Sequence, residues 1–210
     1  MSKICKELHT WANKLKEFSF PYDETKIPLN GIYLLFEKGE LGHGTNRIVR
    51  IGTHTGKDQL RSRLRQHFLT ENKDRSIFRK NIGRCFLNKS HDPYLGTWEL
   101  DMTSKLARDT HNKSIDGKLQ KVIEREITNY MQKNFFFGVI RIDDKKERLE
   151  LESKIISTVS HCKDCGPSKK WLGNYSPKDK IKESGLWLVN ELYKTPLSIK
   201  DFEKLKRLSK

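Results

Sequence analysis

Two side chains in the first third of the chain are spaced so that they could act on one anionic group. Arg63 and His67 lie four residues apart in the stretch KDQLRSRLRQHFL, where Leu60, Leu64 and Phe68 recur at the same interval. This interval predicts a helix that carries both polar side chains on one face. Because a guanidinium and an imidazole there could both contact a phosphate group, the helix is a candidate part of a phosphate-binding site.

Cysteines offer a second kind of chemistry. Cys162 and Cys165 are separated by two residues, which is the spacing of paired metal ligands. A structural zinc site normally needs four ligands, and here only His161 is adjacent and only Cys85 could be recruited from a distance. We therefore expect two reduced loop cysteines, with a zinc site as the alternative. Four scattered cysteines also do not form a disulfide framework.

The charge balance points to a polyanionic partner. The 210 residues include 42 Lys and Arg against 27 Asp and Glu, a formal net charge of +15. Such a surplus favours a nucleic acid over an anionic membrane surface. No apolar run approaches the roughly 18 residues of a transmembrane helix. The N-terminal stretch is typical of an amphipathic helix rather than a signal peptide, so we expect a cytoplasmic protein with no membrane partner.

The order of predicted elements indicates an α+β fold. Strands are predicted at 31–37, 47–54 and 135–142, and a short glycine-rich connection makes the first two antiparallel. Helices are predicted at 3–18, 57–69, 76–87, 117–134, 145–160 and 198–208, with a polar loop at 103–118. The expected architecture is a small three-stranded sheet that carries helices.

This order of residues and elements resembles the GIY-YIG endonuclease family. The first strand begins with the tripeptide GIY at 31–33, the second ends with IG at 51–52, and the helix with Arg63 and His67 follows. After the third strand, a helix contains Glu152 followed by two isoleucines at 155 and 156. The resemblance implies the GIY-YIG nuclease fold, a small three-stranded antiparallel sheet flanked by helices.

The resemblance also divides the chain. Residues 31–175 correspond to the nuclease core, with a helical insertion at about 70–134. Residues 1–30 are then expected to form an N-terminal helix and linker, and residues 176–210 a C-terminal extension packed on the core.

The family implies metal-dependent hydrolysis of a DNA phosphodiester. By position, Tyr33 corresponds to the GIY tyrosine, Arg63 to the helix arginine, His67 to the histidine one turn later, and Glu152 to the single glutamate that binds Mg²⁺ or Mn²⁺. Glu150 is the competitor if the alignment shifts. These residue types suit the reaction, because a guanidinium and a divalent ion neutralise the charge that gathers on the phosphate oxygens.

Two positions depart from the family pattern. The second family tyrosine falls at Arg50, which cannot accept a proton but could bind phosphate or support Tyr33. We keep Arg50 among the predicted catalytic residues. The family asparagine that follows the glutamate has no clear counterpart, because the loop is stretched; Asn174 is the nearest asparagine, and Lys170 could take its place.

A second set of residues is predicted to contact the nucleic acid. The 75–91 segment interleaves basic and apolar residues and could lie along DNA, or its basic face could merely be solvated. Trp171, Trp187 and Tyr175 could stack on bases, but such aromatic residues more often cover a core. The predicted nucleic-acid contacts are His54, Arg61, Arg65, Arg79, Lys80, Arg84, Lys169, Lys170 and Asn174.

The sequence thus predicts a divalent-metal-dependent DNA endonuclease of restriction or defence type, acting as a homodimer on double-stranded DNA. Three alternatives stay open: a structure-specific repair nuclease, a non-catalytic nucleic-acid-binding module with the same fold, and an RNA-directed protein. Arg50 at a tyrosine position is the main support for the non-catalytic module. The presence of Tyr33, Arg63, His67 and Glu152 together argues against it.

Overall fold

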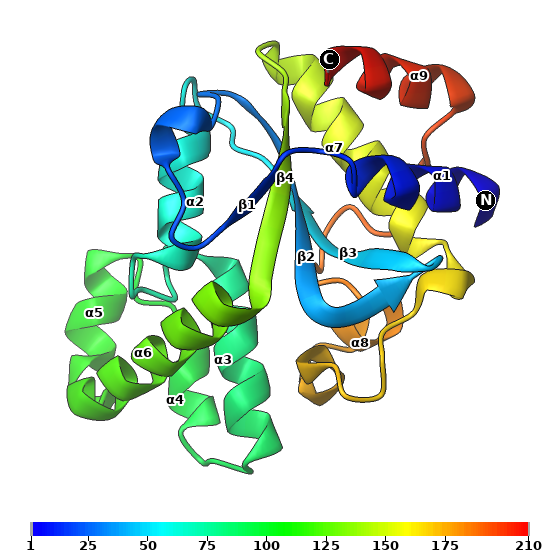
Figure 1. The fold of residues 1–210 in the computed structure, drawn as a ribbon. Coiled ribbons are helices and arrows are strands. Elements are labelled where there is room, and N and C mark those ends of the chain that lie inside the picture. The colour runs from blue at the N-terminus through cyan, green and yellow to red at the C-terminus, as the bar shows by residue number, and fades with distance from the viewer. Residues whose placement is uncertain (1, 210) are drawn as a thin grey trace.

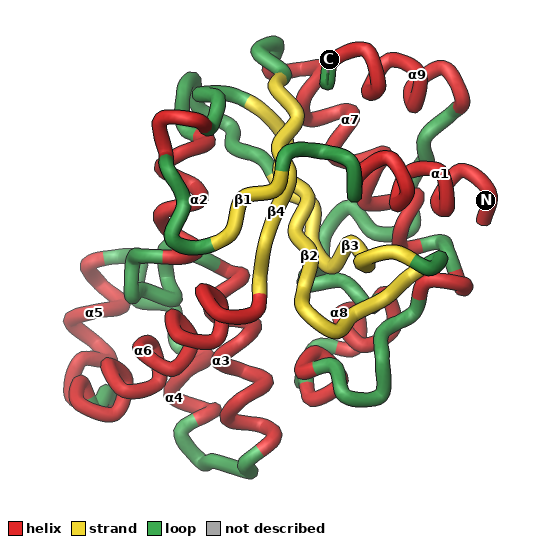
Figure 2. Tube along the Cα trace, viewed as in Figure 1, coloured by secondary structure: helices red, strands yellow, loops and turns green. Residues whose placement is uncertain are grey.

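The computed structural model describes residues 2–209 and has an antiparallel sheet at its centre (Figures 1 and 2). Its strands are β1 (Glu17–Ser19), β2 (Gly31–Gly42), β3 (Thr45–Gly52) and β4 (Phe135–Arg141), in the spatial order β1-β4-β2-β3. Neighbouring strands are antiparallel. The predicted α+β fold with a small antiparallel sheet is confirmed, and the three predicted strands gain β1 as a short fourth strand at one edge.

Helices cover both faces of the sheet (Figure 1). On one face lie α1 (Ser2–Ala12), α7 (Lys145–Ser160) and α9 (Ile199–Leu208). On the other lie α2 (Leu60–Phe68), α3 (Ile77–Lys89), α4 (Leu95–Glu99), α6 (Gly117–Asn134) and α8 (Asp179–Ser184). The predicted helices at 117–134 and 145–160 are confirmed at these bounds. Within residues 2–209, no helix is long and apolar enough to cross a membrane.

Two sequence predictions about secondary structure were wrong. The N-terminal helix does not continue to residue 18: it ends at Ala12, and Phe18 pairs with Phe137 as part of β1. Strand pairing and the stacking of these two phenylalanine rings at 5.5 Å outweigh the helical spacing of the apolar residues. The polar stretch at 103–118 is not all loop, because it includes the short helix α5 (Lys105–His111).

The alternation of β2 explains why the sheet has a core on each side. Tyr33 and Leu35 belong to the core under α2, α3 and α6, whereas Ile32, Leu34 and Phe36 belong to the core under α1 and α7. Successive strand residues point to opposite faces, so a nearly continuous apolar run is what a strand with two buried faces requires. This arrangement turns Tyr33 toward α2.

Candidate active site

Tyr33 and His67 form the centre of the candidate site. Tyr33 lies on β2 and His67 in the last turn of α2, and the Tyr33 hydroxyl is 2.8 Å from His67 Nε2. Both side chains are fully buried. Leu60 and Leu64 pack α2 against the sheet, so the helix presents His67 to Tyr33 from a fixed position.

The register of β3 brings Arg50 to the same face as Tyr33. Tyr33 pairs with Gly52 and Leu35 with Arg50, after which the register shifts by one residue and Val49 forms a β-bulge. Arg50 lies on the Tyr33 side of the sheet because it pairs with Leu35, which faces the same core as Tyr33. The bulge turns Val49 into that core as well. The Arg50 guanidinium lies 4.9 Å from the centre of the Phe78 ring.

His67 is held in the neutral state by its surroundings. Burial lowers the pKa of His67 well below its ordinary value, and the charges of Arg63, Arg50 and Arg79 lower it further. His67 Nδ1 lies 2.7 Å from the Ser76 hydroxyl. A neutral imidazole offers one donor and one acceptor, so His67 can orient the Tyr33 hydroxyl through one nitrogen while Ser76 fixes the other.

This neutral histidine predicts an acid-sensitive fold. The pKa of His67 is lower in the folded than in the unfolded chain, so protonation of His67 favours the unfolded chain. The free energy of unfolding is therefore unaffected by His67 above the unfolded pKa of about 6.5 and decreases as the pH falls below it. The expected decrease is about 1.4 kcal/mol per pH unit.

Urea unfolding of the wild type and of His67→Gln between pH 5 and pH 7.5 measures this contribution. The His67→Gln variant should show a shallower pH dependence, whereas His91→Asn, which replaces an exposed histidine, should follow the wild type. Equal slopes for all three proteins would contradict the assignment of the acid sensitivity to His67.

Arg50 and Arg63 are two cations whose charges reach both His67 and Glu152. Arg50 is buried and donates a hydrogen bond to the Trp187 carbonyl, while its Nε has no hydrogen-bond partner among residues 2–209. Arg63 is half-buried and lines a cavity of about 270 Å³ together with Thr53 and His54. The charges of both arginines act on His67 and on Glu152, which identifies one shared electrostatic site.

Glu152 brings a carboxyl group to this site from α7. Burial raises the pKa of Glu152 to about 7, against the opposing effects of Arg50, of a hydrogen bond from the Thr53 backbone amide, and of Arg63. Glu150, the competing candidate, is exposed and forms an ion pair with Lys154 at 2.7 Å. The structure therefore brings together Tyr33, Arg50, Arg63, His67 and Glu152.

The prediction that the 75–91 segment presents a basic face to a nucleic acid was wrong for Arg79, Lys80 and Arg84 on α3. Arg79 is fully buried and donates to both a carboxylate oxygen and the carbonyl oxygen of Glu124. Arg84 forms a two-pronged ion pair with Glu99, and Lys80 donates to the Glu99 carbonyl. Because these cations are buried and bonded to groups of α4 and α6, α3 does not present them to a nucleic acid.

Five of the six remaining predicted contacts fall into two groups. Arg61 and Arg65 fix the loop before β2, by hydrogen bonds to the Ile27 carbonyl at 2.7 Å and to Glu24 at 2.8 Å. Lys169 and Lys170 are exposed, whereas Asn174 holds the same loop closed by donating to the Ser168 carbonyl.

His54 lies at the cavity. Its Nδ1 is 2.7 Å from the Gly56 carbonyl, and its buried Nε2 has no hydrogen-bond partner in the described part of the chain. Because Nδ1 must carry the proton to donate to that carbonyl, Nε2 is left as an acceptor.

Two of the three aromatic residues singled out in the tail cover the core, as the simpler interpretation predicted. Trp171 and Trp187 are buried, and each donates its indole N–H to Glu37 at 2.9 Å. Tyr175 is exposed. The Trp187 amide also donates to the Val49 carbonyl, so this segment runs along the edge of β3 and holds the carbonyl that receives Arg50.

Sequence reasoning missed several residues that position the site. Ser76 is the N-cap of α3 and could be predicted as such, but nothing in the sequence connects it with His67. Arg148 links the start of α7 to the His54 carbonyl, and Arg79 holds the His67 carbonyl at 2.9 Å. The Arg148 contact joins segments that lie far apart in the chain, and the Ser76 and Arg79 contacts connect α3 with the end of α2. Helical or strand spacing predicts none of these contacts.

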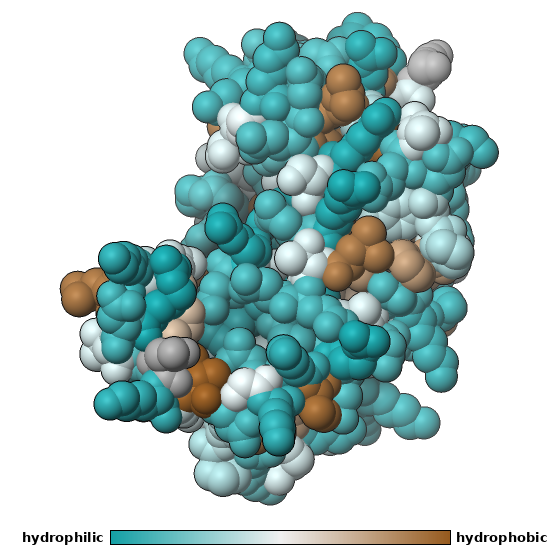
Figure 3. All heavy atoms as spheres, turned by 90° about the vertical axis from the view of Figure 1, so that its left-hand side faces the viewer, coloured by the Kyte–Doolittle hydropathy of each residue, from teal (hydrophilic) through white to brown (hydrophobic). Residues whose placement is uncertain are grey.

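The surface on the α2, α5 and α6 side of the molecule is predominantly hydrophilic, with hydrophobic side chains in separate small patches (Figure 3).

Comparisons with known proteins identify the family. A family model described as the GIY-YIG domain matches residues 2–208, which is nearly the whole chain. No curated protein and no solved structure matches it. The match agrees with the tripeptide on β2, the Ile51-Gly52 end of β3 and the convergence of Arg63, His67 and Glu152 on that end of the hairpin. The chain therefore belongs to the GIY-YIG endonuclease family.

Proposed function

We propose that this protein is a divalent-metal-dependent endonuclease that hydrolyses phosphodiester bonds of double-stranded DNA. The observation that carries the proposal is the single electrostatic site at the open end of the β2–β3 hairpin, where β2 begins and β3 ends. There Arg50 and Arg63 act on both the half-buried carboxyl of Glu152 and the histidine bonded to Tyr33. Two cations beside a half-buried carboxyl and a tyrosine are the groups that phosphodiester hydrolysis uses.

Glu152 fits the metal that the family implies. A carboxyl group whose pKa burial raises to about 7 is poorly compensated by its surroundings, and a divalent cation would stabilise its ionised form. Mg²⁺ and Mn²⁺ prefer oxygen ligands, and Mg²⁺ retains several waters, so one carboxylate suffices. When bound, the ion would neutralise charge on the reacting phosphate and activate water.

The other side chains have separate roles. Arg63 lines the cavity and would bind the scissile phosphate. Tyr33, in its phenolate form, would accept a proton from the attacking water, and His67 would hold the Tyr33 oxygen in position through Nε2. Since His67 is buried and neutral, its role is that of a positioning residue.

The proposal is tested with purified protein and a long duplex DNA of mixed sequence, in Mg²⁺ or Mn²⁺ and in EDTA. Discrete fragments that need the metal would support a sequence-selective nuclease of restriction or defence type. A metal-dependent smear would support a nonspecific nuclease. Intact DNA that shifts on a gel would overturn the catalytic proposal in favour of a binding module, once branched substrates also remain uncut.

Arg50 provides a test of the position where this chain departs from the family. Its buried guanidinium opposes the pKa shift of Glu152 and approaches His67, so Arg50→Ala should lower the cleavage rate about 100-fold, the typical effect of removing one charge-stabilising donor. Arg141→Ala, which removes an exposed arginine, serves as the charge-matched control in single-turnover assays. Full activity of Arg50→Ala would remove Arg50 from the site.

Gly52 tests the close packing around Tyr33. A Cβ atom at Gly52 would lie 2.1 Å from the Tyr33 hydroxyl oxygen, and such a contact forces the tyrosine to move. We therefore expect Gly52→Ala to lose cleavage activity by at least about tenfold while it still binds DNA. Gly96→Ala, where the added methyl group meets open space, is the matched control. Equal activity of the two variants would mean that the Tyr33 hydroxyl has no fixed role.

A further inference from the structure

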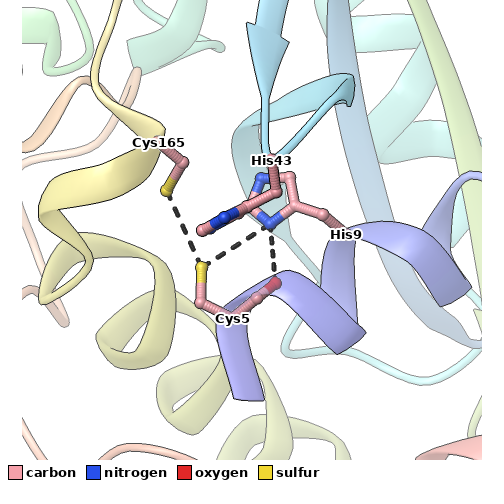
Figure 4. A group of neighbouring side chains, drawn as sticks. All are labelled: Cys5, His9, His43 and Cys165. Atoms are coloured by element: carbon pink, nitrogen blue, oxygen red, sulfur yellow. Dashed lines mark hydrogen bonds between the residues drawn. The ribbon is translucent and has the colours of Figure 1, made fainter. Parts of the chain in front are cut away.

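Four potential metal ligands meet at the turn of the β2–β3 hairpin, which is the end far from Tyr33 (Figure 4). Cys5 and His9 lie on α1, His43 in the turn between β2 and β3, and Cys165 in the loop after α7. One ligand atom from each lies within 4.8 Å of all the others. The sequence directed attention to His161 and Cys85 as partners of the cysteine pair, but the fold supplies Cys5 and His43 instead.

Two distances within the group match those of a tetrahedral zinc site. Zn–S and Zn–N bonds of about 2.3 and 2.0 Å place two ligand sulfurs about 3.8 Å apart, and a sulfur and a nitrogen about 3.5 Å apart. Cys5 Sγ lies 3.7 Å from Cys165 Sγ, and Cys162 Sγ lies 3.3 Å from His43 Nε2. The three cysteines are buried and free of disulfides.

Hydrogen bonding selects the fourth ligand. His9 Nδ1 lies 2.9 Å from the Cys5 carbonyl, and His9 Nε2 accepts the Ile48 amide at 3.2 Å, so both of its nitrogens are engaged with the backbone. Cys162 is adjacent to His43, and its thiol also interacts with those of Cys165 and Cys5. We propose that Cys5, His43, Cys162 and Cys165 bind a structural Zn²⁺ ion, with His9 as a supporting residue beside it.

The backbone around these residues favours their approach. His43 is in the left-handed region at φ 55°, a conformation that costs free energy for a residue other than glycine. Gly42 precedes it, and a Cβ atom there would lie 3.0 Å from the Cys165 Cβ, tighter than an ordinary contact. Gly42 leaves room for the cysteine loop to pack beside the turn. His43 in that turn can therefore reach the cysteines as a ligand.

Such a site would join three segments that are distant in the sequence. The ion would connect the N-terminal helix, the hairpin turn and the loop that begins two residues after α7 ends at Ser160. All four of its positions would be filled by protein, as is typical of a structural rather than a catalytic zinc site. It is separate from the catalytic metal proposed at Glu152 and does not depend on it.

Metal analysis of the purified protein tests the proposal. Protein prepared under reducing conditions with zinc in the growth medium should contain about one zinc per chain. Cys5→Ala, Cys162→Ala, Cys165→Ala and His43→Gln should lose it. His9→Gln should retain it, and so should Cys85→Ala, which changes a buried cysteine in the other core. Removal of the zinc by a chelator should lower the midpoint of thermal unfolding by about 10 °C or more.

Cobalt binding keeps the test independent of variants that fail to fold. The wild type refilled with Co²⁺ should show the visible bands of tetrahedral cobalt and near-ultraviolet thiolate-to-cobalt charge transfer. Purified protein that contains no zinc and gives no such bands would overturn the proposal. A Cys5–Cys165 disulfide in the reduced preparation, or equal zinc loss from Cys85→Ala, would overturn it too. Zinc loss from His9→Gln but not from Cys162→Ala would overturn the assigned ligand set.

Discussion

Replacing Glu152 by glutamine should reduce DNA cleavage by roughly 10³-fold or more while leaving DNA binding nearly unchanged. The Glu152 carboxyl lies within the influence of Arg50 and Arg63, and an amide of the same shape cannot supply the negative charge that holds a divalent ion. The substitution removes a half-buried acid rather than a surface ion pair, so DNA affinity should not fall.

Matched measurements distinguish the loss of the Glu152 carboxylate from a general loss of negative charge on α7. Single-turnover cleavage and gel-shift affinity are compared for the wild type, Glu152→Gln and Glu150→Gln. The last of these removes an exposed carboxylate that pairs with Lys154. Glu150→Gln should cut at the wild-type rate. Normal cleavage by Glu152→Gln would show that the metal is held elsewhere.

Replacing Glu124 by alanine should destabilise the fold by about 3–5 kcal/mol. Glu124 accepts two hydrogen bonds from Arg79 on one carboxylate oxygen, at 2.7 and 2.9 Å, and also accepts the Lys73 amide. Its removal leaves the fully buried Arg79 guanidinium without its counter-ion, and an unpaired buried charge is among the most destabilising features a variant can create.

A double variant distinguishes the missing counter-ion from lost packing. Arg79→Met combined with Glu124→Leu removes both charges and fills the space with apolar groups, so it should recover most of the free energy of unfolding measured by urea denaturation. The same double variant loses the Arg79 bond to the His67 carbonyl, so its cleavage rate should stay below that of the wild type. A single variant as stable as the wild type would contradict the role of the pair.

The sequence predicted the elements that carry the catalytic groups because their patterns are local. The buried run of β2 and the helical repeats of α2 and α7 follow from spacing alone, and they place Tyr33, His67 and Glu152. The burial of α3 could not be predicted in this way. Its arginines are basic by composition, but their partners Glu99 and Glu124 come from later helices.

Other features depend on tertiary packing. The bulge that turns Val49 into the same core as Tyr33 has no signature in the sequence of β3. The end of α1 is set by the pairing of Phe18 with Phe137, two residues more than a hundred positions apart. The cysteine pair at 162 and 165 indicated metal chemistry, yet Cys5 and His43 meet it only through the fold.

The tail segment around Trp187 also bears on solubility. β3 lies at an edge of the sheet, and the exposed edge of a strand can pair with another molecule and start aggregation. The Trp187 amide occupies the Val49 carbonyl on that edge, while the opposite edge is formed by β1, which is only three residues long. The segment that accepts the Arg50 hydrogen bond thus also hinders strand pairing between molecules. Sequence changes that loosen it should promote aggregation and also disturb the position of Arg50.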